Sequence, residues 1–365
     1  MPRRGKDGTV MVAMSGGVDS SVVAAILKRR GHDVVGVTMQ IWQESQTDPR
    51  HSGCCSLGAV EDARRVARIL DIPHYVVNFR ESFRETVIEN FIEEYGAGRT
   101  PNPCVECNRK VKFESLMAKM RELGCTKLAT GHYARVRRNS QTGQYRLLRA
   151  QGGAKDQSYV LYMLEQEQLS KVMFPLGELG SKSVIRQMAA ELGLPVAEKP
   201  DSQEICFVAE SGGYTDFLRE QKPDLFEPGE IVDPEGKVMG EHQGVAGFTV
   251  GQRKGIGLTI PSGRPLFVLK LEPSSNRVVV GDGDLLLTKE VPLESFSWTG
   301  GSSAATCIKV QAKIRYNMEA QPAVLETAPV ARLIFRNPVR AVTPGQIAVA
   351  YRGQTVLGGG IIRQP

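Results

Sequence analysis

The stretch VMVAMSGGVDSSVVAAIL, Val10–Leu27, decides how the N-terminal half of this chain folds. Its apolar run Val10–Met14 predicts a buried strand, and the segment Asp19–Arg30 predicts a helix. Between them, Gly16 and Gly17 allow backbone N–H groups to approach a phosphate closely, and the positive end of the helix favours an anion at the same point. The loop has neither the Gly-Lys-Ser/Thr of a Walker A site nor the GxGxxG of a dinucleotide site. We therefore expect a phosphate-binding loop of another class.

Strand and helix patterns continue to alternate after this loop. Apolar runs predict strands at Val34–Gln40, His74–Asn78 and Thr126–Thr130, and helical segments separate them at Leu57–Leu70, Ser82–Tyr95 and Lys110–Leu123. Strands that alternate with helices of ten or more residues are typical of βαβ units. We therefore predict an α/β domain built on a parallel sheet.

The pattern changes after Pro195, and from Pro223 onward the chain is rich in Gly, Pro and short β-branched runs. The last part contains four short strand candidates, at Ile308–Ile314, Ala331–Phe335, Ala348–Tyr351 and Gly360–Ile362. Such a pattern predicts an antiparallel barrel or sandwich. Domain boundaries are expected near residues 210 and 286.

Composition excludes several classes of protein. The chain has 365 residues, of which 41% are hydrophobic and 24% charged, so it can bury a core without disulfides or a metal. No apolar run approaches the ~18 residues that span a bilayer, and the run after the basic N-terminus is too short for a signal peptide. We therefore expect a cytoplasmic protein. Seven cysteines, an odd number, argue against a disulfide framework.

Basic residues gather in two zones. Residues 123–155 contain no acidic residue and seven basic ones, which are Lys127, Arg135, Arg137, Arg138, Arg146, Arg149 and Lys155. From Glu290 to the end there are eight basic and four acidic residues. Two such zones predict a polyanionic partner, although solvated strand faces would look the same.

Two cysteines lie in unusual contexts, TPNPCVECN around Cys107 and DSQEICFV around Cys206. The flanking Pro-Asn and Asp-Ser-Gln segments predict loops, where burial for packing alone is not expected. A pair of thiols suits sulfur transfer, because one can carry a persulfide while the other activates it or resolves the resulting disulfide. Cys125 and Cys307 are interpreted as packing residues, and the vicinal Cys54 and Cys55 as part of a loop without an assigned role.

The glycine loop resembles the pyrophosphate loop of the ATP pyrophosphatases that cleave ATP to AMP and pyrophosphate. Together the motifs resemble one family within that PP-loop superfamily, the bacterial tRNA-specific 2-thiouridylases, over nearly the whole chain. The shared motifs, in chain order, are SGGVDSS, TPNPxxxCN with KF, GHYARV, KDQSY, DSxxICF, FTVGQRKGIG, RY and PGQ. The resemblance implies a HUP-type domain over residues 1–210, a small central β-rich domain over 211–285 and a C-terminal, tRNA-binding β-barrel over 286–365.

The resemblance also implies an activity and its residues: ATP-dependent transfer of sulfur to C2 of the wobble uridine of tRNA. Cys107 matches the nucleophile and Cys206 the cysteine that bears the persulfide. ATP would contact Ala13, Met14, Ser15, Gly16, Gly17, Val18, Asp19, Ser20, Met39 and Gly131, with Asp19 helping to hold Mg²⁺. The target base would face Asn102, Pro103 and Cys104. The tRNA would contact His132, Lys155, Asp156, Gln157, Arg315, Tyr316 and Gln346.

The sequence departs from the family at Cys104, where many members have aspartate. Cys104, Cys107 and Cys206 supply three thiolates, so a [4Fe–4S] cluster that delivers sulfide is an alternative to the persulfide. Two other classes share parts of the pattern: a PP-loop ligase that uses a nitrogen nucleophile, and a non-catalytic RNA-binding protein. We interpret the chain as the sulfurtransferase, and we expect it to act as a monomer with a sulfur donor such as a cysteine desulfurase or relay protein.

Overall fold

A computed structural model of the chain describes residues 8–42, 57–152, 155–200, 205–209, 211–258, 265–301 and 306–364. Its first part is built on a parallel sheet with the strand order β3-β2-β1-β4-β7. The strands are β1 (Thr9–Ala13), β2 (Asp33–Gln40), β3 (His74–Asn78), β4 (Lys127–Ala129) and β7 (Val172–Met173). All neighbouring strands in this sheet run parallel, which confirms the α/β prediction.

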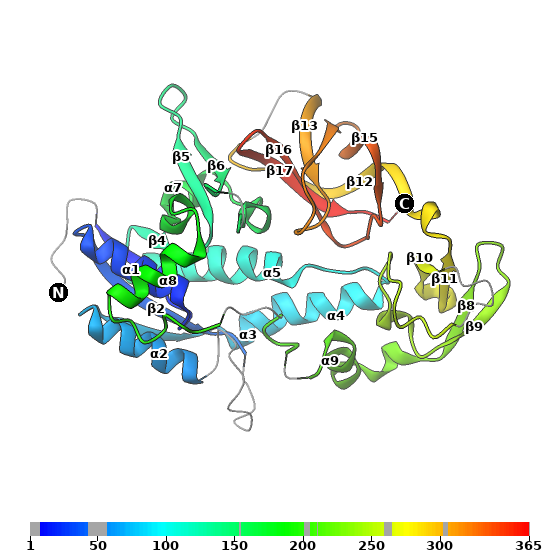
Figure 1. The fold of residues 1–365 in the computed structure, drawn as a ribbon, viewed down its shortest axis with the longest axis horizontal. Coiled ribbons are helices and arrows are strands. Elements are labelled where there is room, and N and C mark those ends of the chain that lie inside the picture. The colour runs from blue at the N-terminus through cyan, green and yellow to red at the C-terminus, as the bar shows by residue number, and fades with distance from the viewer. Residues whose placement is uncertain are drawn as a thin grey trace.

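Helices cover both faces of this sheet (Figure 1). In β1, Val10 and Val12 point to one hydrophobic cluster and Met11 to another, as the period of two in a strand requires. The first cluster includes residues of α1 (Val18–Arg29), α2 (Leu57–Ile69) and α8 (Lys182–Glu191), and the second includes η2 (Cys107–Ser115) and α6 (Leu116–Glu122). Because both faces are buried, the strands read as apolar runs in the sequence.

Two long helical segments lie together beyond β3. The first consists of α3 (Arg80–Phe83), the π-helical η1 (Arg84–Ile88) and α4 (Glu89–Gly96), and the second of α5 (Pro103–Glu106), the π-helical η2 and α6. The sequence predicted the second helix from Lys110, but it begins at Pro103. Asn102 caps it by accepting a hydrogen bond from the Val105 N–H, and Pro103 fits the first turn because its missing N–H is not needed there.

A small mixed sheet follows, with the order β10-β11-β8-β9. Its strands are β8 (Gly229–Val232), β9 (Val238–His242), β10 (Phe267–Glu272) and β11 (Arg277–Gly281), and α9 (Tyr214–Gln221) precedes them. The remaining helices are short: η3 (Ser158–Leu161), α7 (Gln166–Lys171), η4 (Pro175–Glu178), η5 (Pro223–Phe226), η6 (Val245–Gly247), η7 (Pro273–Ser275) and η8 (Gly283–Leu286). No helix among the described residues is long and apolar enough to span a bilayer.

The C-terminal strands form a closed antiparallel barrel, which decides between the barrel and the sandwich. They are β12 (Leu287–Trp298), β13 (Cys307–Lys313), β14 (Gln321–Glu326), β15 (Arg332–Arg340), β16 (Ile347–Arg352) and β17 (Thr355–Ile362). The order is β12-β15-β14-β13-β16-β17, and pairing between β12 and β17 closes it. Closure leaves no free edge between these strands.

A hairpin from the first part of the chain joins this barrel. It consists of β5 (Ala134–Arg138) and β6 (Tyr145–Arg149), and Leu148 of β6 pairs with Thr355 of β17 (Figure 1). The sequence analysis did not predict this hairpin. It places the acid-free basic zone beside the C-terminal barrel, where the second basic zone lies.

Candidate functional site

The loop between β1 and α1 is tightly folded around its own hydroxyl groups. The Ser15 N–H donates to Ser20 Oγ over 3.0 Å, and Ser21 Oγ donates to the Gly17 carbonyl over 2.8 Å. Gly16 has a φ of +68°, and a Cβ there would lie 2.1 Å from the Ala59 carbonyl oxygen. Gly17 is the N-cap of α1 and has no side chain to accept from the first N–H groups of the helix. A phosphate oxygen suits that position.

The carboxylate of Asp19 is held by two residues that the sequence analysis missed. Lys182 Nζ lies 2.7 Å from each Asp19 oxygen, and the Tyr133 hydroxyl donates to Oδ1 over 2.6 Å. Lys182 is the first residue of α8, and that helix packs against α1. Asp19, the predicted magnesium ligand, is therefore paired with an ammonium group in this structure.

A second ammonium group, that of Lys199, lies on the other side of the loop. Lys199 Nζ donates to the Gly16 carbonyl over 3.2 Å and to Asp62 Oδ2 over 2.8 Å. Lys199 and Asp62 are both largely buried. Lys182 and Lys199 each offset one carboxylate beside the loop, so the first N–H groups of α1 remain as a positive partner for phosphate groups.

The predicted nucleotide residues gather at one edge of the parallel sheet. The order β3-β2-β1-β4-β7 has a topological switch point between β1 and β4, because β2 and β3 are added on one side of β1 and β4 and β7 on the other. In such sheets, ligands bind at the switch point, outside the carboxyl ends of the strands. Gly131 follows β4 and lies against Asp19 and Ser20. Met39 at the end of β2 packs against two hydrophobic clusters, one of which also contains Cys107. The segment Ala13–Ser20, Met39 and Gly131 thus share the carboxyl edge of the strands.

Cys107 and Cys206 pack on the same hydrophobic cluster, which also contains Phe83, Phe91, Phe207 and Phe217 and is called the aromatic cluster below. Cys107 is only 8% exposed, and Cys206 is partly buried. The expectation that loops keep these cysteines out of the core was wrong for Cys107, because it begins η2 inside the helix that Pro103 starts.

Phe207 fixes the position of its neighbour Cys206. Its ring centroid lies 5.0 Å from that of Phe217, 5.2 Å from that of Phe91 and 5.8 Å from that of Phe83. Such edge-on aromatic contacts are specific in geometry. The preceding residues 201–204 of the DSQEICFV motif lie outside the described residues, as do Cys54 and Cys55.

Cys104 lies in α5, one helical turn before Cys107, and is exposed. Together with Cys206 these are the three cysteines of the cluster alternative. Within the described ranges, which include all three, no group of three or more His, Cys, Asp or Glu side chains is placed to hold a metal ion. The side chains as they stand do not fit a [4Fe–4S] cluster.

Two of the predicted tRNA-contacting segments come together beside the barrel. The exposed ring of Tyr316 lies 6.0 Å from that of Tyr159, which closely follows Lys155–Gln157. Lys313 Nζ lies 5.7 Å from the Tyr316 ring and 5.8 Å from the Tyr159 ring. Arg315 is exposed on the same segment. Exposed rings next to cations suit stacked bases and phosphates.

Asp156 and Gln157 stabilise the conformation of this segment through hydrogen bonds. Asp156 accepts hydrogen bonds from the Ala150 N–H and from Ser158, and Gln157 Oε1 accepts from the Tyr133 N–H over 3.0 Å. Lys155 is exposed. The three residues of this motif therefore differ in role, since one faces solvent and two hold the turn.

His132 and Gln346 lie apart from this surface. The His132 ring packs against Phe113 and Phe174, and its Nδ1 lies 2.7 Å from Thr130 Oγ1. Burial, with Lys112 nearby, holds the pKa of His132 well below its usual range, so the imidazole is neutral at pH 7. Gln346 donates to the backbone of Thr100 and Pro101.

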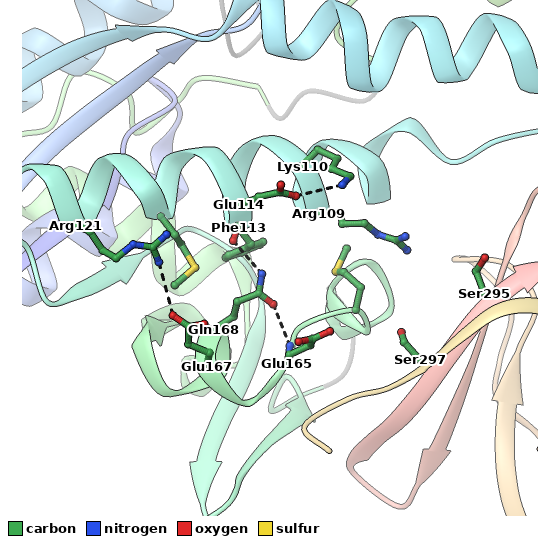
Figure 2. Close-up of a pocket in the computed structure, with 12 residues that line it drawn as sticks. Arg109, Lys110, Phe113, Glu114, Arg121, Glu165, Glu167, Gln168, Ser295 and Ser297 are labelled. Atoms are coloured by element: carbon green, nitrogen blue, oxygen red, sulfur yellow. Dashed lines mark hydrogen bonds and ion pairs between the residues drawn. The ribbon is translucent and has the colours of Figure 1, made fainter. Parts of the chain in front are cut away.

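A cavity of about 420 Å³ opens between η2, α6, α7 and the barrel strand β12 (Figure 2). Arg109, Lys110 and Glu114 line it from the helix that carries Cys107, and Ser295 and Ser297 line it from β12. Two ion pairs, Lys110–Glu114 and Arg121–Glu167, form between residues that line this cavity. No sequence motif marked these residues as part of a site, because the two walls come from distant parts of the chain.

Family models match the chain in three consecutive segments. They are a tRNA methyl transferase HUP domain over residues 8–210, a tRNA methyl transferase PRC-barrel domain over 215–282 and an aminomethyltransferase β-barrel domain over 288–362. A protein of Heliobacterium modesticaldum named tRNA-specific 2-thiouridylase MnmA is 51% identical over 97% of this chain and 92% of its own length. The proteins of the same name from Clostridioides difficile and Lachnoclostridium phytofermentans are 44% and 47% identical, over 97% of this chain and 98% and 99% of their own lengths.

Two solved structures with similarity to this chain have lower identity. A 4-thiouridine synthetase in complex with RNA and ATP has 21% sequence identity and a TM-score of 0.36, over 60% of this chain and 51% of that one. An NMN synthetase from Francisella tularensis has 16% identity and a TM-score of 0.33, over 60% and 77%. The assignment below therefore depends on the family models and the curated relatives.

Proposed function

The chain belongs to the family of tRNA-specific 2-thiouridylases, and we propose that it thiolates C2 of the wobble uridine of tRNA with ATP as the activating substrate. The membership makes it a tRNA sulfurtransferase. One observation supports the finer proposal most strongly: the sheet edge that holds the phosphate loop also reaches, through Met39, the cluster on which Cys107 and Cys206 pack. A PP-loop nitrogen ligase has no need of such a pair.

The first half of the reaction is activation of the base. Uridine O2 attacks the α-phosphorus of ATP, pyrophosphate leaves, and O2 becomes part of an AMP leaving group. The N-terminus of α1 and the ammonium groups of Lys182 and Lys199 supply positive charge for the phosphates. The wobble base must first unstack and swing toward Asn102–Cys104.

The second half is sulfur transfer. The terminal sulfur of a Cys206 persulfide attacks C2, and the Cys107 thiolate attacks the sulfur that stays on Cys206. AMP then leaves with the original oxygen, and a Cys107–Cys206 disulfide forms. A thiol reductant supplies the two electrons that restore both thiols, and a separate sulfur donor reloads Cys206.

Magnesium would enter this site together with ATP. Mg²⁺ usually takes one or two carboxylates and completes its shell with phosphate oxygens and water. Asp19 supplies the carboxylate in the loop that could bind Mg²⁺. In this structure the Asp19 carboxylate contacts the Lys182 ammonium group and accepts a hydrogen bond from the Tyr133 hydroxyl. When bound, the ion would neutralise phosphate charge.

The cluster alternative would need Cys104, Cys107 and Cys206 to gather around iron. Since the described side chains form no such group, no step is assigned to a cluster. Anaerobically purified protein is expected to be colourless and free of iron. Broad absorbance near ~400 nm with stoichiometric iron would instead favour the cluster.

Nucleoside mass spectrometry tests the proposed function. Unmodified tRNA is incubated with the protein, Mg-ATP, a thiol reductant and a donor of sulfane sulfur, namely a cysteine desulfurase with cysteine, and 2-thiouridine is expected as the product. Cys107→Ala and Cys206→Ala should abolish it, whereas Cys307→Ala, at an exposed position of β13, should not. Thiouridine at the wild-type level from both active-site variants would refute the assigned roles. AMP release without thiouridine would refute the proposal that the wobble uridine is the sulfur acceptor.

A further inference from the structure

The segment that leads into Cys107 is held at one residue, Thr100, by hydrogen bonds to the two other parts of the chain. Its hydroxyl donates to Thr249 Oγ1 of the central domain over 3.3 Å. Its N–H donates to the Pro344 carbonyl of the barrel over 2.8 Å. Its own carbonyl accepts from Gln346 Nε2 over 2.9 Å.

The side-chain amide of Gln346 donates both of its N–H groups to this segment. Nε2 donates a second time, to the Pro101 carbonyl over 3.2 Å. A primary amide nitrogen carries two N–H groups, and two carbonyls account for both. The amide thus holds consecutive peptide units just before the base-facing residues Asn102–Cys104.

The barrel loop that carries Gln346 fits against the same backbone. Gly345 has a φ of +86°, and a Cβ there would lie 2.9 Å from the Thr100 nitrogen. Two further hydrogen bonds fix this loop to the last strand: Gly345 N–H to the Ile362 carbonyl and Ile362 N–H to the Gln346 carbonyl, over 2.9 and 2.7 Å. The loop is therefore a rigid support.

The chain between this support and the nucleophile is stiff. Pro101 and Pro103 each have a fixed φ, and the Asn102 side chain accepts from the Val105 N–H. Helix α5 then runs directly into Cys107. A displacement at Thr100 is for these reasons carried to Cys107 rather than absorbed on the way.

We propose that Gln346 is a positioning residue, which ties the barrel to the segment 100–107 and so sets where Cys107 stands. This inference rests on the proposed role of Cys107, but the hydrogen bonds between Gln346 and the segment 100–107 do not depend on that role. A barrel that holds tRNA through Arg315 and Tyr316 would then also align the nucleophile.

The test measures Cys107 without tRNA or ATP. Gln346→Met keeps the size of the side chain and removes its donors. The reduced protein is treated with iodoacetamide, and alkylation of each cysteine is followed by peptide mass spectrometry, with exposed Cys307 as the internal reference. Loss of two ordinary hydrogen bonds is expected to accelerate alkylation of buried Cys107 roughly tenfold. Gln311→Met, at an exposed glutamine of β13, is the matched control and should change nothing.

Two further measurements separate positioning from RNA binding. Gly345→Ala retains the amide but pushes on Thr100, so it should also accelerate Cys107 alkylation. In Gln346→Met the single-turnover thiolation rate at saturating tRNA should fall, and saturation removes any effect of the substitution on tRNA affinity from this rate. Unchanged Cys107 alkylation in both variants, or an unchanged single-turnover rate at saturating tRNA, would overturn the proposal. The alkylation result holds even if the wild-type protein makes no thiouridine, so the two failures are distinguishable.

Discussion

Lys182 shows how much of the phosphate site depends on one side chain. Its ammonium group lies 2.7 Å from both oxygens of Asp19 at the N-terminus of α1. If Lys182 is replaced by methionine, the Asp19 carboxylate loses that countercharge and repels the phosphates of ATP.

We expect Lys182→Met to weaken ATP binding roughly 10- to 100-fold, the loss of one charge-assisted contact. Isothermal titration calorimetry without tRNA measures this directly. Lys182→Arg should retain most of the affinity. Lys28→Met, at the opposite end of α1, is the control and should bind ATP normally. Wild-type affinity in Lys182→Met would show that neither the ammonium group itself nor its neutralisation of Asp19 contributes to nucleotide binding.

At the scale of elements, the phosphate loop is fitted against α2. A Cβ at Gly16 would lie 2.1 Å from the Ala59 carbonyl, whereas one at Gly17 would meet only Ser15 Oγ, at 3.5 Å. Gly16→Ala should therefore destabilise the protein by roughly 1–3 kcal/mol, since both φ and the contact are unfavourable. Gly17→Ala should leave the thermal unfolding midpoint almost unchanged. Equal midpoints for the two variants would contradict this account.

Prediction succeeded for the elements whose signal is local. The central strands β1, β2 and β4 of the parallel sheet are mostly buried, so their apolar runs stand out, and the SGGVDSS loop is contiguous. The predicted start of the helix that carries Cys107 lay too far along the sequence, because TPNP resembles a loop. In the structure Asn102 caps this helix and Pro103 begins it. The hairpin β5–β6 was missed because arginines fill its strands. Lys182 and Lys199 could not be found, since they reach the loop from 163 and 183 residues away.

At the scale of the whole molecule, the two basic zones lie side by side because β6 pairs with β17. Phosphate contacts release counterions, so tRNA affinity should fall with salt. We expect Arg315→Gln to reduce the slope of log affinity against log salt by about one. Tyr316→Ala should weaken binding while the slope stays the same, since stacking involves no counterion. Filter binding over a salt series measures both, and identical slopes for wild type and Arg315→Gln would exclude a phosphate contact.

The pairing of β6 with β17 also has a consequence for synthesis of the chain. Leu148 finds its partner Thr355 only when synthesis has passed residue 355, and the Arg149 N–H likewise waits for the Gln354 carbonyl. Until then the ribosome carries a nascent domain with an open β edge, a surface that other chains can join. A premature stop codon even a few residues before 355 would release a product with that edge exposed. Translation must therefore pass Thr355 before this edge of the nascent domain can be covered.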